Sequence, residues 1–525
     1  MTLLVTSVYV VDEATLRQRC AAAFSAGADA VELRIDSWTG DVGAIASFLR
    51  ENADRTWIVT CRSRAEGGES AETAEQRAAL IATATRDTNA YVDFEFADWR
   101  RSGEVRRVLG ETAAIEDSPT GGSTRQSGGS TRRRLILSSH RFDAPPDEVA
   151  AVFAEMASTG EAAVFKTAFI ARDICDAVSA LDLLRQQTKP AIAICMGDEG
   201  LMSRVLSKKF GAFATYAGLS EAGSTAPGQL TTNAMKNLYR WDAIDGATRV
   251  FGVIGDPVAH SLGPRLFNRW FADAEMNAVY LPMRVTTSRD CLARFLTVCA
   301  QQAWLDVAGL SVTIPHKTGV LRWLGDRVDR TAQGVGAVNT VVFAKDGPTG
   351  FNTDCHAAAA SIGAALGCRP DELADVSIDL LGTGGAARAI LSGLCGLGCP
   401  VTLYGRSAER TKSLAEEFGC RAAAWDDRGN RSGDVLVNCT SVGMWPHVDA
   451  SPMPSGSLDG LRLVFDTVYN PLETKLLVDA KAAGAATQSG LDMFIRQAAA
   501  QFELWTGQAP DVDAGRRWLM SSSGC

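Results

Sequence analysis

The sequence places a lysine and a histidine in neighbouring apolar runs, an arrangement that could support imine chemistry. Lys166 lies within VFKTAF, and His140 ends LILSSH, the apolar run before it. A lysine in a buried strand is costly unless it is paired or neutral, and a neutral amine can form an imine with a ketone. Taken alone, Lys166 could reach solvent from a strand end, and His140 could be an ordinary core histidine. Because the two occur together, we interpret them as a nucleophile and a proton carrier.

Three arginines end or follow other apolar runs of the first half. They are Arg34, Arg62 and Arg204, and their convergence on one face would leave surplus positive charge without an anionic ligand. They therefore indicate a substrate that carries a carboxylate. Other polar residues in comparable positions are Glu32, Glu95, Thr225 and Gln229.

A glycine-rich turn in the second half could hold a pyrophosphate. The stretch IDLLGTGGAARAIL from Ile378 places Gly382, Gly384 and Gly385 between an apolar strand and a helix start. Such a turn can also be a purely structural joint. The next strand, Val401 to Tyr404, ends in Gly405, Arg406 and Ser407, with Arg410 one helical turn later and no carboxylate. Arginines suit the 2′-phosphate of NADP, although two solvated arginines at a helix start would look the same.

Eight short apolar runs alternate with helical, Ala-rich segments in the first half. They begin at Leu3, Ala30, Thr56, Tyr91, Leu135, Ala162, Ala191 and Phe213. Eight strands separated by helices predict a closed parallel (β/α)8 barrel, in which the carboxyl ends of the strands and the loops that follow them form the active face. The Gly/Ser-rich segment 118–134 does not follow this pattern, and we expect a flexible insertion on the opposite face.

The second half begins after a polar stretch, Asp242 to Thr248, that we interpret as a linker. A new strand starts at Val250, and further strands that end in polar residues precede the glycine-rich turn. The overall fold class is therefore α/β, with a barrel followed by a module that contains a Rossmann dinucleotide-binding domain.

Composition narrows the classes of protein. The 525 residues are 46% hydrophobic and 22% charged, with a net charge of −9, so we expect several globular domains and no nucleic-acid or membrane partner. Thirteen cysteines without a CxxC pair indicate reduced thiols, and five histidines without ligand spacing predict no metal. The first residues show no targeting signal and no apolar segment is long enough to span a bilayer, so we expect a cytoplasmic location.

The first half resembles type I 3-dehydroquinate dehydratases through ELRID, CRSRAEGGE, SSH, the FK strand, GLMSR and APGQ. The resemblance implies Lys166 as the Schiff-base lysine, His140 as the proton shuttle and Glu66 as the carboxylate that orients His140. The substrate contacts that it implies are Ser7 (with Thr6 as the alternative), Glu32, Arg34, Arg62, Arg204, Thr225 and Gln229. The family usually has serine where Thr225 stands, which keeps a hydroxyl.

The second half resembles shikimate dehydrogenases through AHS, VTIPHK, GAVNT, NTD, GTGGAAR, GRSAER and the final glutamine. The resemblance implies Lys317 and Asp354 as the acid/base pair, although Asp354 alone could be a helix cap. Implied substrate contacts are Ser261, Gly263, Thr313, Asn339, Tyr469 and Gln497. Implied NADP(H) contacts are Gly382, Thr383, Gly384, Gly385, Ala386, Arg406, Ser407, Arg410, Thr467 and Gly490.

Four residues depart from the usual dehydrogenase motifs. Gly263 replaces the second serine of Ser-x-Ser, Ser311 replaces an asparagine, and Cys355 and Asp492 replace glycines. Gly263 removes a hydroxyl donor and opens space beside the ring carbon that bears the carboxylate. Because quinate carries an extra hydroxyl on that carbon, we hypothesise a relaxed or shifted specificity towards quinate.

These observations predict a bifunctional enzyme of the shikimate pathway. Residues 1–243 would dehydrate 3-dehydroquinate to 3-dehydroshikimate. Residues 249–355, completed by 490–525, would bind the substrate of the dehydrogenase, and residues 356–489 would bind NADP(H) for reduction to shikimate. Two alternatives stay open: a dehydrogenase that uses quinate, or a non-catalytic regulator that binds such ligands. The regulator is disfavoured because both lysines and both proton-transfer partners are present and no basic extension is found.

Overall fold

The computed structural model describes residues 2–115, 132–220, 226–288 and 290–522. The chain divides into two compact units, each of which is described by itself. The first comprises Met1–Arg249 with Asn277–Thr286, and the second comprises Val250–Met276 with Thr287–Cys525. Most of the predicted insertion 118–134, and also Thr225, lie outside the described residues.

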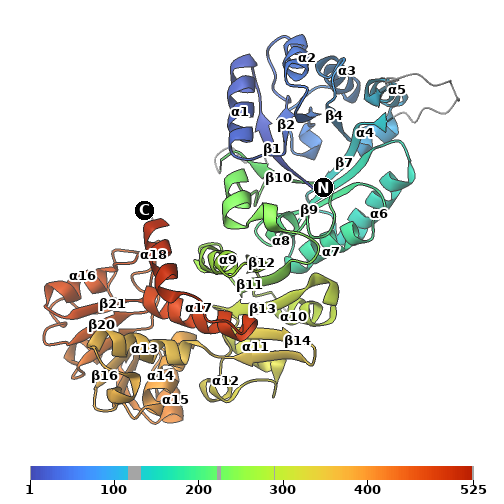
Figure 1. Cartoon of the computed structure of the whole chain (residues 1–525). Coiled ribbons are helices and arrows are strands. Elements are labelled where there is room, and N and C mark those ends of the chain that lie inside the picture. The colour runs from blue at the N-terminus through green and yellow to red at the C-terminus, as the bar shows by residue number, and fades with distance from the viewer. Residues whose placement is uncertain (1, 116–131, 221–225, 289, 523–525) are drawn as a thin grey trace. The chain divides into compact units, whose positions relative to one another are not determined.

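The first unit is a nearly closed barrel of eight parallel strands (Figure 1). The strands are β1 (Leu3–Tyr9), β2 (Ala30–Arg34), β3 (Thr56–Thr60), β4 (Tyr91–Glu95), β7 (Leu135–Arg141), β8 (Val164–Ile170), β9 (Ala191–Met196) and β10 (Ala214–Gly218). Their order is β10-β1-β2-β3-β4-β7-β8-β9. At the junction of β9 and β10, the N–H of Phe213 donates to the carbonyl of Ala191 over 2.7 Å. The predicted barrel is thus confirmed, although β9 and β10 are not neighbours in the hydrogen-bonded sheet and the barrel is therefore only nearly closed.

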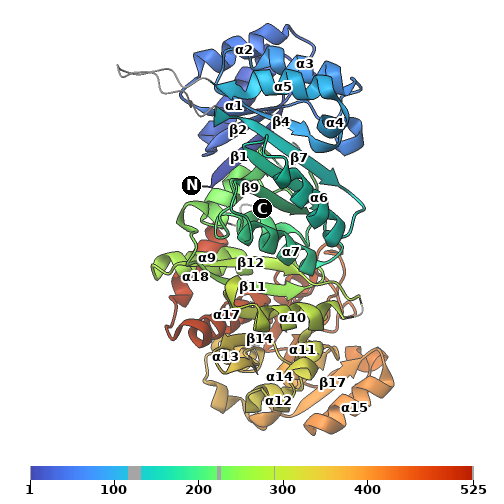
Figure 2. The same cartoon turned by 90° about the vertical axis from the view of Figure 1, so that its right-hand side faces the viewer.

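Helices cover the outside of the barrel. They are α1 (Glu13–Ser25), α2 (Val42–Glu51), α3 (Ala74–Ala84), α4 (Phe96–Arg101), α5 (Gly103–Ala113), α6 (Pro146–Ser158), α7 (Ile174–Arg185) and α8 (Leu201–Val205). Figure 2 shows α2, α3 and α5 side by side on this outer layer. Capping boxes at Asp12 and Thr73 fix where α1 and α3 begin, because each side chain accepts from a free N–H of the first turn.

Apolar residues fill the barrel interior below a layer of polar residues. Val5, Ala30, Ile58, Ile136 and Val164 belong to one buried cluster. Each lies two positions before a polar residue of its strand, namely Ser7, Glu32, Thr60, Ser138 and Lys166. Because strand side chains alternate with a period of two, both sets point to the same face. The polar set therefore lies towards the carboxyl ends of the strands, the usual place of an active site in such barrels.

Short elements complete this unit. They are the two-residue strands β5 (Ala114–Ile115) and β6 (Arg132–Arg133), which pair antiparallel, and η1 (Arg64–Glu66), η2 (Ala234–Leu238) and η3 (Trp241–Ala243). The segment grouped with this unit also includes β12 (Ala278–Arg284). Of these elements, η1 matters most for the site because it carries Glu66.

The second unit contains a substrate-domain sheet with the order β11-β13-β14-β15. Its strands are β11 (Arg249–Gly255), β13 (Val307–Val312), β14 (Thr340–Ala344) and β15 (Gly347–Phe351). The first two are parallel, and β14 and β15 follow as antiparallel neighbours. Its helices are α9 (Gly263–Asp273), α10 (Cys291–Gln301), η4 (Ala303–Leu305), α11 (Lys317–Leu324) and α12 (Arg330–Val335).

A six-stranded parallel sheet of Rossmann type follows in the same unit. Its order is β18-β17-β16-β19-β20-β21, with β16 (Ile378–Leu381), β17 (Val401–Gly405), β18 (Arg421–Ala424), β19 (Val435–Asn438), β20 (Leu463–Asp466) and β21 (Ala486–Ser489). The helices are α13 (Asp354–Leu366), η5 (Pro370–Leu373), α14 (Gly385–Gly396), α15 (Ala408–Phe418), η6 (Trp425–Asn430), α16 (Lys475–Ala482), α17 (Gly490–Thr506) and α18 (Val512–Ser522). The strand order reverses next to β16, and ligands bind at the carboxyl ends of the strands on either side of such a reversal.

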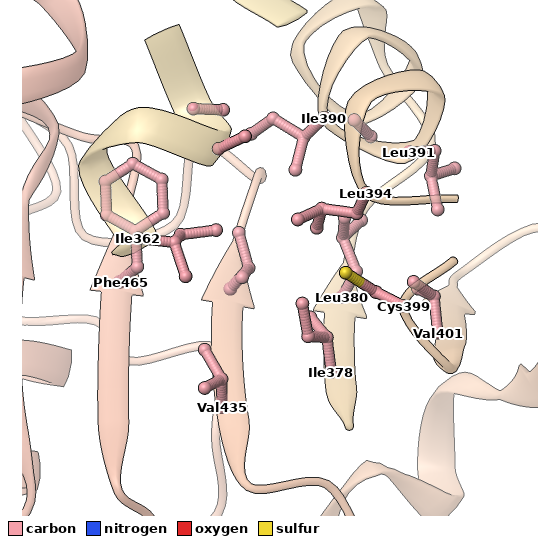
Figure 3. Packing of buried hydrophobic residues seen from close by; sticks show 14 of the residues in the cluster. Ile362, Ile378, Leu380, Ile390, Leu391, Leu394, Cys399, Val401, Val435 and Phe465 are labelled. Carbon is pink, nitrogen blue, oxygen red and sulfur yellow. The ribbon is translucent and has the colours of Figure 1, made fainter. Parts of the chain in front are cut away.

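The core of this domain joins α13 and α14 to the sheet. Figure 3 shows Ile378 and Leu380 of β16 facing Leu394 of α14, with Ile362 of α13 near Phe465 of β20. This packing holds α14 against β16, and the glycine-rich turn joins the end of the strand to the start of the helix. Among the described residues, no helix is both long and apolar enough to cross a membrane.

Candidate active sites

Lys166 lies inside the barrel with its amine surrounded by protein groups. The residue is 4% exposed, and Nζ donates to Asp93 Oδ2 over 2.9 Å. The second carboxylate, Glu32 Oε1, lies 3.7 Å from Nζ, and the ring centroid of Tyr216 lies 3.9 Å from it. Two carboxylates and an aromatic face thus surround the amine, and burial separates it from bulk water.

The carboxylate of Asp93 accepts hydrogen bonds from three side chains. Besides Lys166, it accepts from Arg62 over 2.6 Å and from the hydroxyl of Ser138 over 2.7 Å. Burial alone would raise the pKa of Asp93, but the charges of Arg62 and Lys166 hold it well below its usual range. Asp93 therefore remains a carboxylate next to Lys166.

His140 contacts the carboxylate of Glu66 through two polar groups. Glu66 Oε2 lies 2.9 Å from His140 Nδ1 and accepts from the backbone N–H of His140 over 2.9 Å. Burial, together with the cations Arg62 and Lys166, places the pKa of His140 well below its usual value. Burial also raises the pKa of Glu66 to about 7. A neutral His140 that points Nδ1 to Glu66 keeps Nε2 free to accept a proton.

The remaining acids and hydroxyls on this face form one network. Glu32 accepts from the hydroxyl of Ser7 over 2.6 Å and from that of Thr60 over 2.9 Å. Ser7, and not Thr6, bonds Glu32, since the hydroxyl of Thr6 lies 2.5 Å from that of Thr232. Arg34 pairs with Asp36 over 2.5 Å and lies 4.7 Å from the ring centroid of Tyr9.

Arg204 differs from the other two arginines. Arg34 and Arg62 each pair with a carboxylate of the protein. Of the three arginines from which we expected unpaired positive charge, only Arg204 lacks a carboxylate partner among the described residues. The hydrogen-bond partners of Arg204 are the carbonyls of Tyr216 and Pro227, both at 3.4 Å, and its buried Nε has no partner among the described residues. Burial lowers the pKa of Arg204 to about 10. A buried cation with spare donors is well suited to a carboxylate ligand.

Sequence reasoning missed Asp93 and Tyr216 as parts of this site. Asp93 stands two positions before Glu95 in YVDFEF, so the strand period already placed both on one face. Tyr216 gave no comparable signal, because an aromatic residue in a strand is usually core. Gln229 lies shortly after the undescribed segment 221–225, and its N–H donates to the carbonyl of Ala226 over 3.3 Å.

In the second unit, Lys317 and Asp354 lie together. Lys317 begins α11 and Asp354 begins α13, and Nζ donates to Asp354 Oδ2 over 2.6 Å. Their side chains are 16% and 9% exposed, so the pair is largely sheltered yet reachable by a small ligand. A Cβ added at Gly385, the first residue of α14, would lie 3.5 Å from Lys317 Cδ. The ion pair and the glycine-rich turn are therefore neighbours.

Predicted substrate contacts cluster around the same pair. Asn339 donates to Thr353 Oγ1 over 2.9 Å and reaches Gln497 Oε1 at 3.5 Å. Gln497 also donates to the carbonyl of Phe494, whose ring lies 5.1 Å from that of Tyr469. Two other predicted contacts lie at loop ends of the substrate domain: Ser261 Oγ accepts from Gly263 N over 3.1 Å, and the N–H of Thr313 donates to Ile254 over 2.9 Å.

Three of the four residues that depart from the usual dehydrogenase motifs contact other residues of the protein. Ser311 donates to Gln501 Oε1 over 2.5 Å, and Cys355 packs against Gly393 of α14. Asp492 accepts from Ser361 over 2.7 Å and from Arg496 over 2.7 Å. It also pairs with Arg516. Burial opposes the charge of Asp492, but these donors lower its pKa. Asp492 thus ties α13, α17 and α18 together.

The glycine-rich turn has the shape that a pyrophosphate requires. Gly382 has φ +111°, and a Cβ there would lie 3.0 Å from the carbonyl of Cys439. Gly384 precedes α14 without a side-chain cap, so the first N–H groups of the helix keep their capacity to donate. Arg406 and Arg410 are exposed, and Ser407 caps α15. Gly490 contacts Thr467 so closely that a Cβ would lie 2.1 Å from its carbonyl oxygen.

Two further findings concern metals and thiols. Within the described ranges, no group of three or more His, Cys, Asp or Glu side chains is arranged to hold a metal ion. The twelve described cysteines are all free.

Comparison with protein families gives matches in both halves. Type I 3-dehydroquinase matches residues 4–245. The shikimate dehydrogenase substrate binding domain matches 253–341, and the shikimate 5'-dehydrogenase C-terminal domain matches 490–519.

Individual relatives agree with these matches. A bifunctional 3-dehydroquinate dehydratase/shikimate dehydrogenase, chloroplastic, of Arabidopsis thaliana is 34% identical over 499 residues, which are 92% of this chain and 78% of the relative. A shikimate dehydrogenase (NADP(+)) of Maridesulfovibrio salexigens is 37% identical over 52% of this chain and 96% of its own. A crystal structure of shikimate 5-dehydrogenase from Thermus thermophilus with NADP(H) and shikimate is 34% identical, with a TM-score of 0.45 over 52% of this chain and 100% of the other. Since the first of these relatives aligns with nearly the whole chain and through both halves, the chain belongs to the family of bifunctional 3-dehydroquinate dehydratase/shikimate dehydrogenases.

Proposed function

We propose that the barrel dehydrates 3-dehydroquinate through an imine on Lys166 and that the second unit reduces the product, 3-dehydroshikimate, to shikimate with NADPH. The observation that carries the first step is the buried amine of Lys166 beside Asp93, with the Glu66–His140 pair on the adjacent strand. The product of the first reaction is the substrate of the second, which gives the fusion a chemical rationale.

In the dehydration, the neutral amine of Lys166 attacks the ketone carbon through Nζ. The C–N bond forms, and the carbonyl oxygen leaves as water with the two protons of the amine. Nε2 of His140 then removes a proton from the neighbouring carbon while the imine accepts the electron pair. The pair returns to expel the hydroxyl group, which leaves as water with the proton from His140. Hydrolysis of the imine finally restores the amine of Lys166.

The binding roles follow from charge and position. Arg204, a buried cation with spare donors, would hold the substrate carboxylate, and Gln229 and Thr225 would contact its hydroxyls. Glu66 would keep His140 in the tautomer with Nε2 free. Asp93 would hold Lys166 and Arg62 in place before the substrate arrives.

In the reduction, Lys317 would protonate the substrate oxygen and Asp354 would orient Lys317. NADPH supplies the hydride when it is bound. The turn Gly382–Ala386 fits a pyrophosphate, and Arg406, Ser407 and Arg410 suit a 2′-phosphate. Asn339, Tyr469 and Gln497 would contact the substrate beside the ion pair, and Thr467 and Gly490 would line the nicotinamide site. We propose three functional domains: the dehydratase barrel at 1–243, the substrate domain of the dehydrogenase at 249–355 with 490–525, and the NADP-binding domain at 356–489.

Borohydride trapping with 3-dehydroquinate tests the first activity. We expect a mass increase on Lys166, and product analysis with added NADPH should yield shikimate. Lys166→Met should abolish trapping and dehydration, whereas Lys189→Met, which changes an exposed lysine of the same barrel, should change neither. Wild-type protein that binds the ligand without forming an adduct would instead support the regulator.

Two measurements test the second activity. Lys317→Ala should remove nearly all oxidation of shikimate while NADP binding persists, and Lys412→Ala, on the exposed face of α15, should leave both intact. The ratio of kcat/KM for quinate and shikimate tests the specificity hypothesis based on Gly263. We expect measurable quinate oxidation, and strong rejection of quinate would contradict that hypothesis.

A further inference from the structure

A continuous line of alternating charges runs outward from Lys166. Lys166 contacts Asp93, Asp93 contacts Arg62, and Arg62 NH1 lies 3.7 Å from Glu95 Oε1. Beyond Glu95 the line continues through a second arginine, Arg77, to Asp98. The proposed function uses the inner part of this line and leaves the outer part unexplained.

Arg77 is an unusual residue for the outside of a barrel. It lies on α3, yet it is only 1% exposed. Its NH1 donates to a carboxylate oxygen of Glu95 and to the carbonyl of Cys61 over 3.2 Å, and its NH2 donates to Asp98 over 2.5 Å. Its Nε is buried without a hydrogen-bond partner among the described residues. Burying an arginine is costly, so this one has a defined place that depends on Glu95.

Glu95 connects Arg77 to the proton-transfer pair. Its Oε1 accepts from the N–H of Ser63 over 2.8 Å, and Ser63 is the residue that precedes η1. Three residues later η1 ends in Glu66, whose carboxylate holds His140. The orientation of Glu95 therefore fixes both the start of the segment that carries Glu66 and one side of Arg62.

We propose that Arg77 is a positioning residue for the dehydration: by neutralising and orienting Glu95, it keeps Arg62 on Asp93 and Glu66 on His140. The inference rests on the roles proposed above for Lys166 and His140. Without Arg77, Arg62 would be the remaining cation facing Glu95, and it would be drawn from Asp93, at 2.6 Å, towards Glu95, at 3.7 Å. Asp93 and Lys166 would then lose their fixed geometry.

Charge also links Arg77 to the pH dependence of the reaction. The charged and titratable groups that face Glu66 are Arg62, Glu95, His140 and Asp93, and those that face His140 are Arg62, Lys166, Asp93, Arg34 and Glu66. Burial is the main cause that raises the pKa of Glu66 to about 7, and the charge of Glu95 contributes to this rise. An uncompensated Glu95 would therefore favour protonation of Glu66, the partner of His140.

The test is the dehydratase rate of the full chain with Arg77→Met, measured from about pH 5 to about pH 9. We expect kcat to fall by about 10- to 100-fold, since displacement of about 1 Å in a catalytic group costs rates of this order. KM should change by less than about threefold because Arg77 is not near the substrate carboxylate site. The acid limb of the kcat profile should move to higher pH.

Two companion variants separate positioning from general damage to the fold. Arg77→Met combined with Glu95→Gln removes both charges, so the acid limb should return towards the wild-type position. Arg77→Lys keeps the charge but loses the forked donors, so it should keep the wild-type pH profile with a reduced kcat. Arg100→Met, which breaks an exposed pair with Glu155 in the same unit, is the matched control and should behave as wild type.

Far-UV circular dichroism and the thermal unfolding transition of the barrel show whether each variant is folded. A wild-type rate and profile in Arg77→Met would overturn the proposal. A second result would also overturn the proposal: kcat of Arg77→Met falls, its pH profile does not move, and adding Glu95→Gln does not restore kcat. That result would mean that Arg77 has a purely structural role. If Arg77→Met does not fold, Arg77→Lys decides: an unchanged kcat overturns the proposal. Absence of dehydration in the wild type would instead refute the proposed function itself.

Discussion

The carboxylate of Asp93 meets a lysine, an arginine and a serine hydroxyl inside the barrel. Each of these groups would be costly to bury alone, and together they satisfy one another. Asp93 thereby fixes the position of Lys166 before the substrate binds. Replacing Asp93 with asparagine, which has the same shape but no charge, should therefore show how much the charge contributes to catalysis.

Asp93→Asn should lower kcat for dehydration by about 100-fold, a loss of the order that removing a proton-transfer group causes. The amide presents a donor to Lys166 or to Arg62 in place of an acceptor, so one of them loses its partner. Steady-state kinetics with 3-dehydroquinate measure the effect. Asp176→Asn, which weakens the pair between this buried carboxylate and the exposed Arg172 elsewhere in the barrel, should leave kcat within twofold. An equal loss in both variants would contradict a specific role for Asp93.

A second buried carboxylate predicts a pH dependence of stability. Asp466 is fully buried at the end of β20, and burial raises its pKa to about 6, although Thr474, Val468 and Asn438 donate to it. A carboxyl whose folded pKa is raised contributes stability below its unfolded pKa, near 3.8, and that contribution disappears as the pH rises through about 6. Ionisation of Asp466 therefore destabilises the fold at neutral pH.

Asp466→Asn removes this ionisation while an amide can still accept two of the hydrogen bonds and donate to Thr474. Relative to wild type, its free energy of unfolding should rise between about pH 4 and pH 7 by about 3 kcal/mol, from a shift of about two pKa units at 1.36 kcal/mol each. Urea denaturation across this range measures the difference. Asp434→Asn is the control of opposite sign, because a hydrogen bond from Ser377 lowers the pKa of Asp434. A difference that does not vary with pH would contradict the buried-acid explanation.

Single residues also show where sequence reasoning ends. Lys166, His140 and Glu66, and likewise Lys317 and Asp354, are predicted by short motifs, and the pairs Glu66–His140 and Lys317–Asp354 lie within hydrogen-bonding distance. Their catalytic roles stay predictions. Asp492 could not be interpreted from the sequence, because its partners Ser361 and Arg516 are 131 and 24 positions away.

At the scale of elements, the contact between α13 and α14 sets the position of the dinucleotide turn. Cys355 stands on α13 where the usual motif has glycine, and opposite it α14 has Gly393. A Cβ added at Gly393 would lie 2.9 Å from the carbonyl oxygen of Cys355 and 3.2 Å from its Sγ. The glycine thus compensates for the cysteine and lets the helices approach closely.

Gly393→Ala should destabilise the second unit by about 1 to 3 kcal/mol, because the added methyl has no space. It should also weaken NADP binding, since α14 carries the turn. The matched control lies on the same helix: a Cβ at Gly396 meets no heavy atom within 4 Å, so Gly396→Ala should stabilise by about 0.5 to 1 kcal/mol. Urea denaturation and NADP titration measure both. Equal effects of the two substitutions would refute the close helix contact.

The elements themselves were largely predictable. All eight barrel strands coincide with the apolar runs, although β7 and β8 each end one residue beyond theirs, because buried parallel strands need continuous apolar residues on both faces. Less predictable features depend on long-range geometry. The weak pairing of β9 with β10 has no local signal. Neither does the docking of α17, in which Trp505 donates to the carbonyl of Val341 and Gln501 to that of Asn339, from 164 and 162 positions away.

At the scale of the whole molecule, each compact unit has its own core. The interior of the barrel is closed by residues of eight strands, and the Rossmann core by residues of α13, α14 and the six-stranded sheet. The predicted domain limits 1–243 and 249–355 stay predictions, while the contact-based division falls at Arg249 and Val250. Ligands of the two proposed sites should therefore stabilise different parts of the chain.

Differential scanning calorimetry of the full chain should show two transitions, of which NADP+ shifts only one. A ligand at 100 times its Kd stabilises the folded form by about 2.7 kcal/mol, which for a unit of this size corresponds to a rise in Tm of about 5 to 10 °C. Reduction of the imine with borohydride leaves product on Lys166 and should shift the other transition. Gly393→Ala assigns the peaks, because it should lower only the transition that NADP+ raises. A single transition that moves as a whole with NADP+ would mean that the chain unfolds as one cooperative block, and the division into two independently stable units would then be wrong.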